Sequence, residues 1–98
     1  MNIVYMGSRN AGYFGLKHLI ENNYDISMVV TTEDTPNAWY KYVKTLAKKY
    51  NLPVSIPKKI KNIDFINSIV KLKPDIIFSM YYDKIIPKKI LESSKYNI

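Results

Sequence analysis

The chain alternates short apolar segments with amphipathic ones, and this alternation limits its possible folds more than any other feature. Apolar segments typical of buried strands lie at residues 2–6, 25–30, 53–57 and 74–79. Segments with helical spacing of apolar side chains separate them, at residues 11–21, at residues 39–50 and after a capping residue, Asn62. Strands that alternate with helices in this way form a parallel sheet covered by helices. The pattern predicts an α/β, Rossmann-like, three-layer fold.

The order of the strands follows from the handedness of their connections. Right-handed crossovers favour the sheet order 3-2-1-4, and prolines at both ends of residues 53–57 predict an edge position for that strand. Ligands bind at the carboxyl ends of the two strands where the order reverses, the first and the fourth. The candidate site therefore lies between residues 7–10 and 79–86. Pro87 predicts the start of a short last helix, and we expect the chain to end before a fifth strand forms.

Composition excludes several classes of function. With 98 residues the chain is one small domain, and the absence of cysteine leaves no disulfide, thiolate-metal or thiol-nucleophile chemistry; we predict no metal site. No apolar run approaches the ~20 residues that span a bilayer, and the first residues do not resemble a signal peptide. We expect a cytoplasmic protein with no membrane contact. The net charge of +7 comes from dispersed lysines without a recognised module, so we do not expect nucleic-acid binding.

The first loop, residues 7–15, differs from a dinucleotide-binding fingerprint. Arg9 stands where the second glycine of GxGxxG would be, and no acidic residue directly follows Val30 at the end of the second strand. We therefore do not expect NAD binding. The loop can still hold an anion, because N–H groups at a helix N-terminus attract negative charge. Arg9, the single arginine, would bind a phosphate at two points, or it simply faces solvent.

The second loop, residues 79–87, follows the clearest strand. Its two tyrosines and two isoleucines would form a flat apolar pocket for a ring, or they pack the loop against the following helix. We expect Asp83 to form an exposed pair with Lys84. His18, the single histidine, lies in the middle of the first helix, where we expect a surface position without a catalytic role. We expect Trp39 and the tyrosines of residues 39–50 to belong to the core.

Together these segments resemble the N-terminal domain of formyltransferases that use 10-formyltetrahydrofolate. The resemblance covers essentially all 98 residues, and its most specific parts are residues 46–54 and the stretch from Lys73 to Tyr82 with Ile85-Ile86 after it. Methionyl-tRNA formyltransferases usually have Ala-Tyr-Gly after this strand. The Ser79-x-Tyr-Tyr form found here, and Thr31-Thr-Glu-Asp34, are similar instead to enzymes that act on nucleotide-linked amino sugars, such as UDP-4-amino-4-deoxy-L-arabinose.

The resemblance implies that a formyl group passes from 10-formyltetrahydrofolate, a co-substrate, to the amine of a nucleotide-linked amino sugar. It implies that the folate pterin lies on the backbone of Lys84, Ile85 and Ile86, with Tyr81 and Tyr82 nearby. Backbone groups suit a pterin, whose edge alternates donors and acceptors. The resemblance also implies that the sugar nucleotide contacts three residues of the first loop, Ser8, Arg9 and Asn10.

The family's catalytic set is an Asn-x-His motif in the next strand and a later aspartate. The histidine and the aspartate have no counterpart in this chain. Asn97 is a candidate for the asparagine, but an ungapped match places it at a turn position usually held by glycine, whose left-handed conformation asparagine tolerates. We favour the turn, and we expect residues 1–98 to be the front part of the catalytic domain, truncated before the catalytic strand and inactive alone.

Two other interpretations stay open. The chain could be a fragment of a methionyl-tRNA formyltransferase, which the Tyr81-Tyr82 pair disfavours. It could also be a non-enzymatic Rossmann-like module that binds a nucleotide or a partner. In that case a homo-oligomer would cover the open edge of its sheet.

Overall fold

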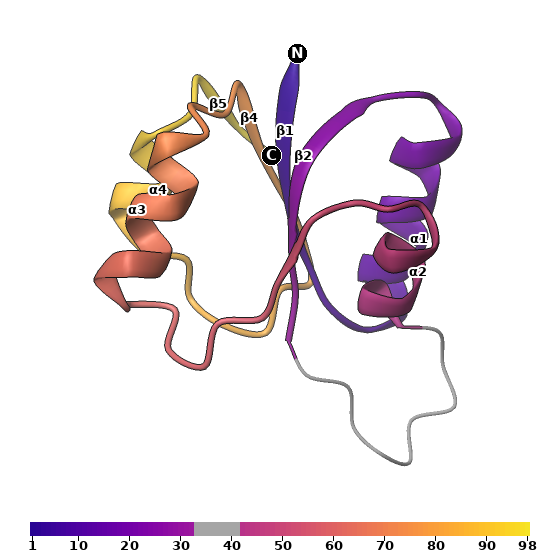
Figure 1. Cartoon of the computed structure of the whole chain (residues 1–98), viewed down its shortest axis with the longest axis horizontal. Coiled ribbons are helices and arrows are strands. Elements are labelled where there is room, and N and C mark those ends of the chain that lie inside the picture. The colour runs from indigo at the N-terminus through magenta and orange to yellow at the C-terminus, as the bar shows by residue number, and fades with distance from the viewer. Residues whose placement is uncertain (33–41) are drawn as a thin grey trace.

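A five-stranded parallel sheet runs through the middle of the protein, in the order β3-β2-β1-β4-β5 (Figure 1). The structure is a computed structural model, and it describes residues 1–32 and 42–98. Its elements are β1 (Asn2–Gly7), α1 (Arg9–Glu21), β2 (Asp25–Val30), α2 (Val43–Lys49), β3 (Val54–Ser55), α3 (Ile63–Lys71), β4 (Ile76–Met80), α4 (Lys88–Glu92) and β5 (Tyr96–Asn97). The order confirms the predicted 3-2-1-4 arrangement, with β3 at an edge, and adds β5 beside β4.

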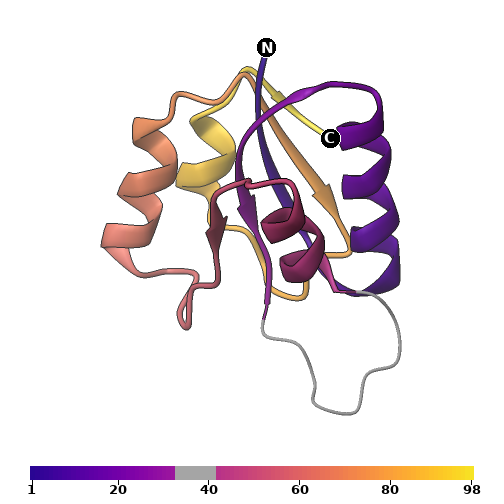
Figure 2. The same ribbon diagram turned by 45° about the vertical axis from the view of Figure 1, so that its right-hand side comes forward.

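Helices cover both faces of the sheet, as the alternating sequence pattern predicts. The helices α1 and α2 lie on one side and α3 and α4 on the other, and the two views agree (Figure 1 and Figure 2). The central strand β1 is apolar on both faces because each face meets a helical layer; Val4 and Tyr5 are both fully buried. Tyr5 belongs to the core cluster on the α1 and α2 side, and Val4 to the one on the α3 and α4 side.

Two helices begin at different residues from those predicted. Tyr42 has an extended backbone and precedes α2, which begins at Val43; the rest of the predicted start, residues 39–41 with Trp39, lies outside the described residues. Val43, Leu46 and Ala47 are the buried residues of α2, as the apolar spacing predicted, whereas Tyr50, also predicted for the core, is exposed at the C-cap. The first helix begins earlier than predicted, at Arg9.

The prediction for the end of the chain was wrong. A fifth strand does form, because Tyr96 N–H donates to Asp75 C=O at 3.0 Å and Ile98 N–H donates to Ile77 C=O at 2.9 Å. Asn97 therefore has strand geometry and is not among the described residues with a positive φ. Its side chain instead holds the turn after α4, accepting from Ser94 Oγ at 2.8 Å and donating to Leu91 C=O at 3.1 Å.

Candidate functional site

The carboxyl ends of β1, β2 and β4 meet at one edge of the sheet, the lower edge in Figure 1. The strand register aligns them, because Met6 of β1 pairs with Val30 of β2 on one side and with Ser79 of β4 on the other. The two loops predicted to form the site leave the sheet at this edge. After β1 come Ser8 and the first two residues of α1, Arg9 and Asn10, and we call residues 8–10 the loop after β1. Residues 81–87 follow β4. The topology thus brings both predicted loops together.

A polar network connects the loops across this edge. Arg9 Nε donates to Asp83 Oδ1 at 2.9 Å in an ion pair, and Thr32 Oγ1 donates to Asp83 Oδ2 at 3.3 Å. Thr32 Oγ1 also lies 3.0 Å from Ser8 Oγ. Ser8 is buried at the start of α1, and its hydroxyl does not cap the helix. Asn10, the third predicted residue of the first loop, is exposed.

This network corrects the predicted partner of Asp83, and it includes Thr32, which was not a predicted site residue. Asp83 pairs with Arg9, 74 positions away, rather than with its neighbour Lys84. Lys84 turns the other way, and its Nζ donates to the carbonyl oxygens of Pro57 and Lys58 at 3.2 and 3.1 Å. Thr32 was noted only as part of the family resemblance. Its position two residues after the carboxyl end of β2, at the edge where ligands bind in such sheets, is the signal that would have identified it.

Two residues with a strained backbone conformation lie at the same edge of the sheet. Five described residues other than glycine have a positive φ. Three of them, Asn23, Asn51 and Lys73, directly follow helix C-caps, where a left-handed residue is the usual way to end a helix. The other two do not follow a helix C-cap: Arg9, with φ of 62°, is the first residue of α1, and Tyr81, with φ of 52°, is the first residue after β4. Strain of this kind persists where the surroundings impose it, and it clusters at binding sites.

The loop after β4 divides its apolar side chains between two directions. Tyr82 and Ile86 pack against the core on the α3 and α4 side, as the packing interpretation of this loop predicted. Tyr81 and Ile85 are 72% and 88% exposed, as a surface for a ring requires. The packing interpretation is therefore correct for half of the loop, and ring binding at the exposed half stays a prediction.

The backbone of residues 84–86 is open to a ligand. Within the described part of the chain, neither the N–H nor the C=O groups of these three residues bond to another protein group. Lys84 anchors the loop through its side chain, so the loop is held while its backbone stays available. An edge of backbone donors and acceptors beside the exposed Ile85 fits a flat heterocycle with alternating donors and acceptors, such as a pterin.

The hydroxyl of Tyr82 is buried without a hydrogen-bond partner among the described residues. Burial, and secondarily the charge of Asp83, raise the pKa of Tyr82 to about 12. An unsatisfied buried hydroxyl costs free energy, so Tyr82→Phe is expected to raise the free energy of unfolding by about 1 kcal/mol at pH 7. Urea denaturation measures this, and lower stability would mean that the hydroxyl has a partner.

The same variant has an expected pH signature. A folded-state pKa above the unfolded value of about 10 means that the unfolded chain loses the Tyr82 proton first. The contribution of Tyr82 to stability is thus complete below pH 10 and is lost as the pH rises through about 12. Tyr82→Phe should weaken the fall in stability over this range. Tyr24→Phe, at an exposed tyrosine, is the matched control and should leave the fall unchanged.

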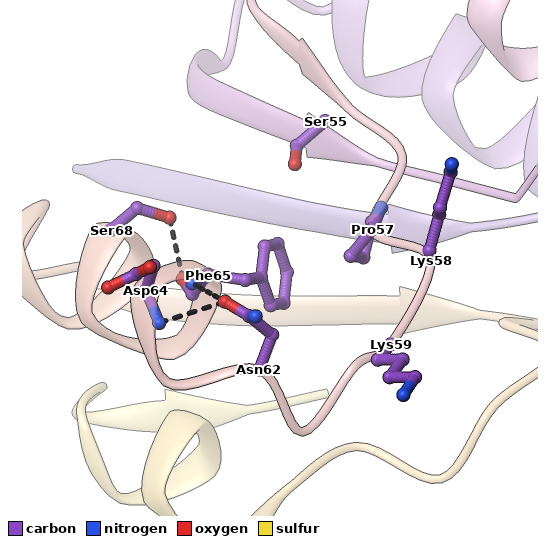
Figure 3. A pocket seen from close by; sticks show the side chains of 8 residues that line it. All are labelled: Ser55, Pro57, Lys58, Lys59, Asn62, Asp64, Phe65 and Ser68. Carbon is purple, nitrogen blue, oxygen red and sulfur yellow. Dashed lines mark hydrogen bonds between the residues drawn. The ribbon is translucent and has the colours of Figure 1, made fainter.

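A second concavity lies farther along the sheet, between the end of β3 and the start of α3 (Figure 3). Its volume is about 510 Å³, and Phe65 and Pro57 supply apolar lining. Asn62 caps α3 as predicted, its Oδ1 accepting from the N–H groups of Asp64 and Phe65 at 2.9 and 3.1 Å. Asn62 Oδ1 therefore already accepts two hydrogen bonds from the start of α3.

The remaining sequence predictions concern residues away from this edge. His18 is exposed on α1, as expected, and interacts with Asn22 at the end of the same helix. Asn97 lies opposite Ile77, three positions before the end of β4, so it is set back from the site. In the described ranges, none of the helices has the length and apolar character that crossing a membrane requires.

No protein-family model matches the chain. Individual proteins do: the chain is 37% identical over 98 residues to the bifunctional polymyxin resistance protein ArnA of Wigglesworthia glossinidia brevipalpis, a match covering 97% of the chain and 15% of that protein. It is 38% identical over 101 residues to the methionyl-tRNA formyltransferase of Bacillus cytotoxicus and 39% identical over 100 residues to that of Clostridioides difficile. These two matches cover 98% and 97% of the chain and 32% of each relative.

The fold and the paired loops define a Rossmann-like α/β domain, with the two loops meeting at the switch point of its sheet. Sequence similarity along almost the whole chain is more specific: formyltransferases are homologues of this chain. It spans about a third or less of the length of these relatives. The two kinds of relative are about equally similar to the chain, so identity alone does not select an acceptor.

Proposed function

We propose that residues 1–98 supply the donor-binding part of an N-formyltransferase and hold 10-formyltetrahydrofolate on the loop after β4. The observation that carries the proposal is the unpaired backbone of residues 84–86 at the switch point of the sheet. The pterin pairs with these backbone groups, Ile85 contacts its face and Tyr81 lies at the rim. When bound, the folate supplies the formyl group; the residues of this chain bind and orient it.

The acceptor we propose is a nucleotide-linked amino sugar. Ser79, Tyr81 and Tyr82 support it, since their pattern is similar to enzymes with such acceptors. The first loop adds Arg9, whose guanidinium suits the phosphates of a nucleotide. Similarity to methionyl-tRNA formyltransferases favours an aminoacyl-tRNA as the second candidate. The two acceptors share an amine that attacks the formyl carbon, so the donor side is common to both.

Donor binding is tested by a backbone substitution. Ile85→Pro removes the N–H of residue 85, whereas Ile85→Ala shortens the side chain and keeps the N–H. Isothermal titration with 5-formyltetrahydrofolate, a stable relative of the donor, should give at least about tenfold weaker binding for Ile85→Pro. Ile85→Ala should stay within about threefold of the unaltered chain. Equal affinities for all three chains would refute backbone recognition, provided that circular dichroism shows each one folded.

The acceptor is tested at the first loop. A uridine diphosphate-linked amino sugar should shift the backbone amide resonances of residues 8–10, and Arg9→Ala should weaken this binding. Lys17→Ala, on the exposed side of α1, is the control for a lost positive charge. Binding of initiator tRNA at residues 8–10, with no response to the sugar nucleotide, would favour the second candidate.

A further inference from the structure

We propose that Asp83 is a positioning residue that fastens the loop after β1 to the loop after β4, so that order in one loop is transmitted to the other. The inference rests on the proposed function, because these are the loops assigned to the acceptor and the donor. It goes beyond that function in assigning Asp83 a role of its own.

The carboxylate of Asp83 accepts hydrogen bonds from two different segments. Each oxygen of Asp83 is used: Oδ1 accepts from Arg9 Nε at 2.9 Å and Oδ2 from Thr32 Oγ1 at 3.3 Å. Thr32 in turn lies within hydrogen-bond distance of the buried Ser8 hydroxyl. One side chain from the loop after β4 thus contacts the residues that follow both β1 and β2.

The backbone has a strained residue on either side of this contact. Arg9, the first residue of α1, and Tyr81 are the two described positive-φ residues that do not follow a helix C-cap. A left-handed backbone costs an ordinary residue free energy, so something in the folded chain must hold it. Asp83 holds the side chain of Arg9 directly, and it follows Tyr81 by two positions. The contact therefore joins the two strained segments.

An exposed ion pair alone would carry little weight, since most such pairs contribute about 1 kcal/mol or less. Arg9 and Asp83 have side chains that are 61% and 35% exposed. What distinguishes this pair is its second branch, through the half-buried Thr32 to a serine that is 2% exposed. Members of a connected network are coupled more strongly than isolated pairs. A ligand that orders one loop would then reduce the ordering cost of binding at the other.

Hydrogen exchange on the 98-residue chain tests the proposal without any ligand. In Asp83→Ala the amides of residues 8–12 should exchange about threefold to fivefold faster, including Gly12 N–H, which bonds to Ser8 C=O at 2.9 Å. Asp83→Asn keeps an acceptor for Arg9 and gains a donor for Thr32, so it should stay within about twofold of the unaltered chain. Asp25→Ala, at the other end of the sheet, is the control for a lost carboxylate.

The transmission itself is tested with a second substitution. Tyr81→Gly relieves the left-handed strain in the loop after β4. It should alter exchange at residues 8–10 when Asp83 is present and leave it unchanged in the Asp83→Ala background. The same comparison with 5-formyltetrahydrofolate should show protection reaching residues 8–10 only when Asp83 is present.

The possible failures are distinguishable. If 5-formyltetrahydrofolate does not bind at all, the proposed function fails, while the ligand-free comparison still decides the role of Asp83. If exchange at residues 8–12 is the same in Asp83→Ala and the unaltered chain, the role of Asp83 is refuted whatever the folate does. A Tyr81→Gly effect that persists without Asp83 would also refute it.

Discussion

Replacing Tyr5 by alanine is expected to lower the free energy of unfolding by about 3–5 kcal/mol, the largest effect that we predict for a single substitution. Tyr5 is fully buried in the central strand, stacks on Phe78 with ring centroids 5.8 Å apart, and donates from its hydroxyl to Gly12 C=O at 2.6 Å. Alanine would leave a cavity and remove the hydroxyl that donates to this carbonyl. Urea denaturation monitored by circular dichroism measures the change.

Tyr5→Phe separates the ring from the hydroxyl. It keeps the packing and removes the bond to Gly12, so the expected loss is about 1 kcal/mol. Because Gly12 lies in the first turns of α1, this bond also fixes the helix start that carries Ser8 and Arg9. A loss below about 1 kcal/mol in Tyr5→Ala would contradict the packing described for the central strand.

The second large effect is expected at Gly12, where α1 approaches the sheet most closely. A Cβ atom there would lie 2.9 Å from the backbone carbon of Gly7 and 3.3 Å from Met80 C=O. These are backbone atoms of β1 and β4, which cannot move aside as a flexible side chain would. Gly12→Val should therefore lower the free energy of unfolding by about 2–3 kcal/mol, although valine has a better helix propensity than glycine.

The control for Gly12→Val is a valine elsewhere on the same helix. Lys17 is exposed, so Lys17→Val adds the same β-branched side chain without a contact to the sheet, and it should cost less than about 0.7 kcal/mol. Gly12→Val should also displace residues 8–10, visible as shifted amide resonances of those residues. If Gly12→Val and Lys17→Val have equal stabilities, the close approach of α1 to the sheet is not required.

Local patterns in the sequence predicted most of the fold. The crossover rule gave the order of the first four strands, prolines marked β3 as an edge strand, and Asn62 was identified as the cap of α3. Each of these rests on neighbours in the chain or on a general rule of handedness. Predictions failed at Tyr42, which precedes α2 instead of lying in it, and at β5, where contacts with a distant segment decide the outcome. The two-residue β5 exists through backbone bonds to β4 and to Asp75 before it, about 20 residues earlier.

The candidate site shows the same division. Both loops were found, because each follows a strand at the switch point. The pairing of Asp83 with Arg9 could not be predicted from spacing, because 74 residues separate the partners and the adjacent Lys84 offered a simpler one. The inward and outward halves of the loop after β4 likewise depend on which side chains the core accepts. The sequence was sufficient to locate the two loops, but the contacts between their side chains could be seen only in the folded structure.

Binding of the folate donor by the backbone of residues 84–86 is the central claim. Titration of the ¹⁵N-labelled 98-residue chain with 5-formyltetrahydrofolate, followed by amide resonances, tests it most directly. The largest shifts are predicted at residues 81–86, with smaller ones reaching residues 8–10 and Thr32. Shifts confined to the pocket around Asn62, Phe65 and Ser68, or no shifts at saturating folate, would contradict the claim.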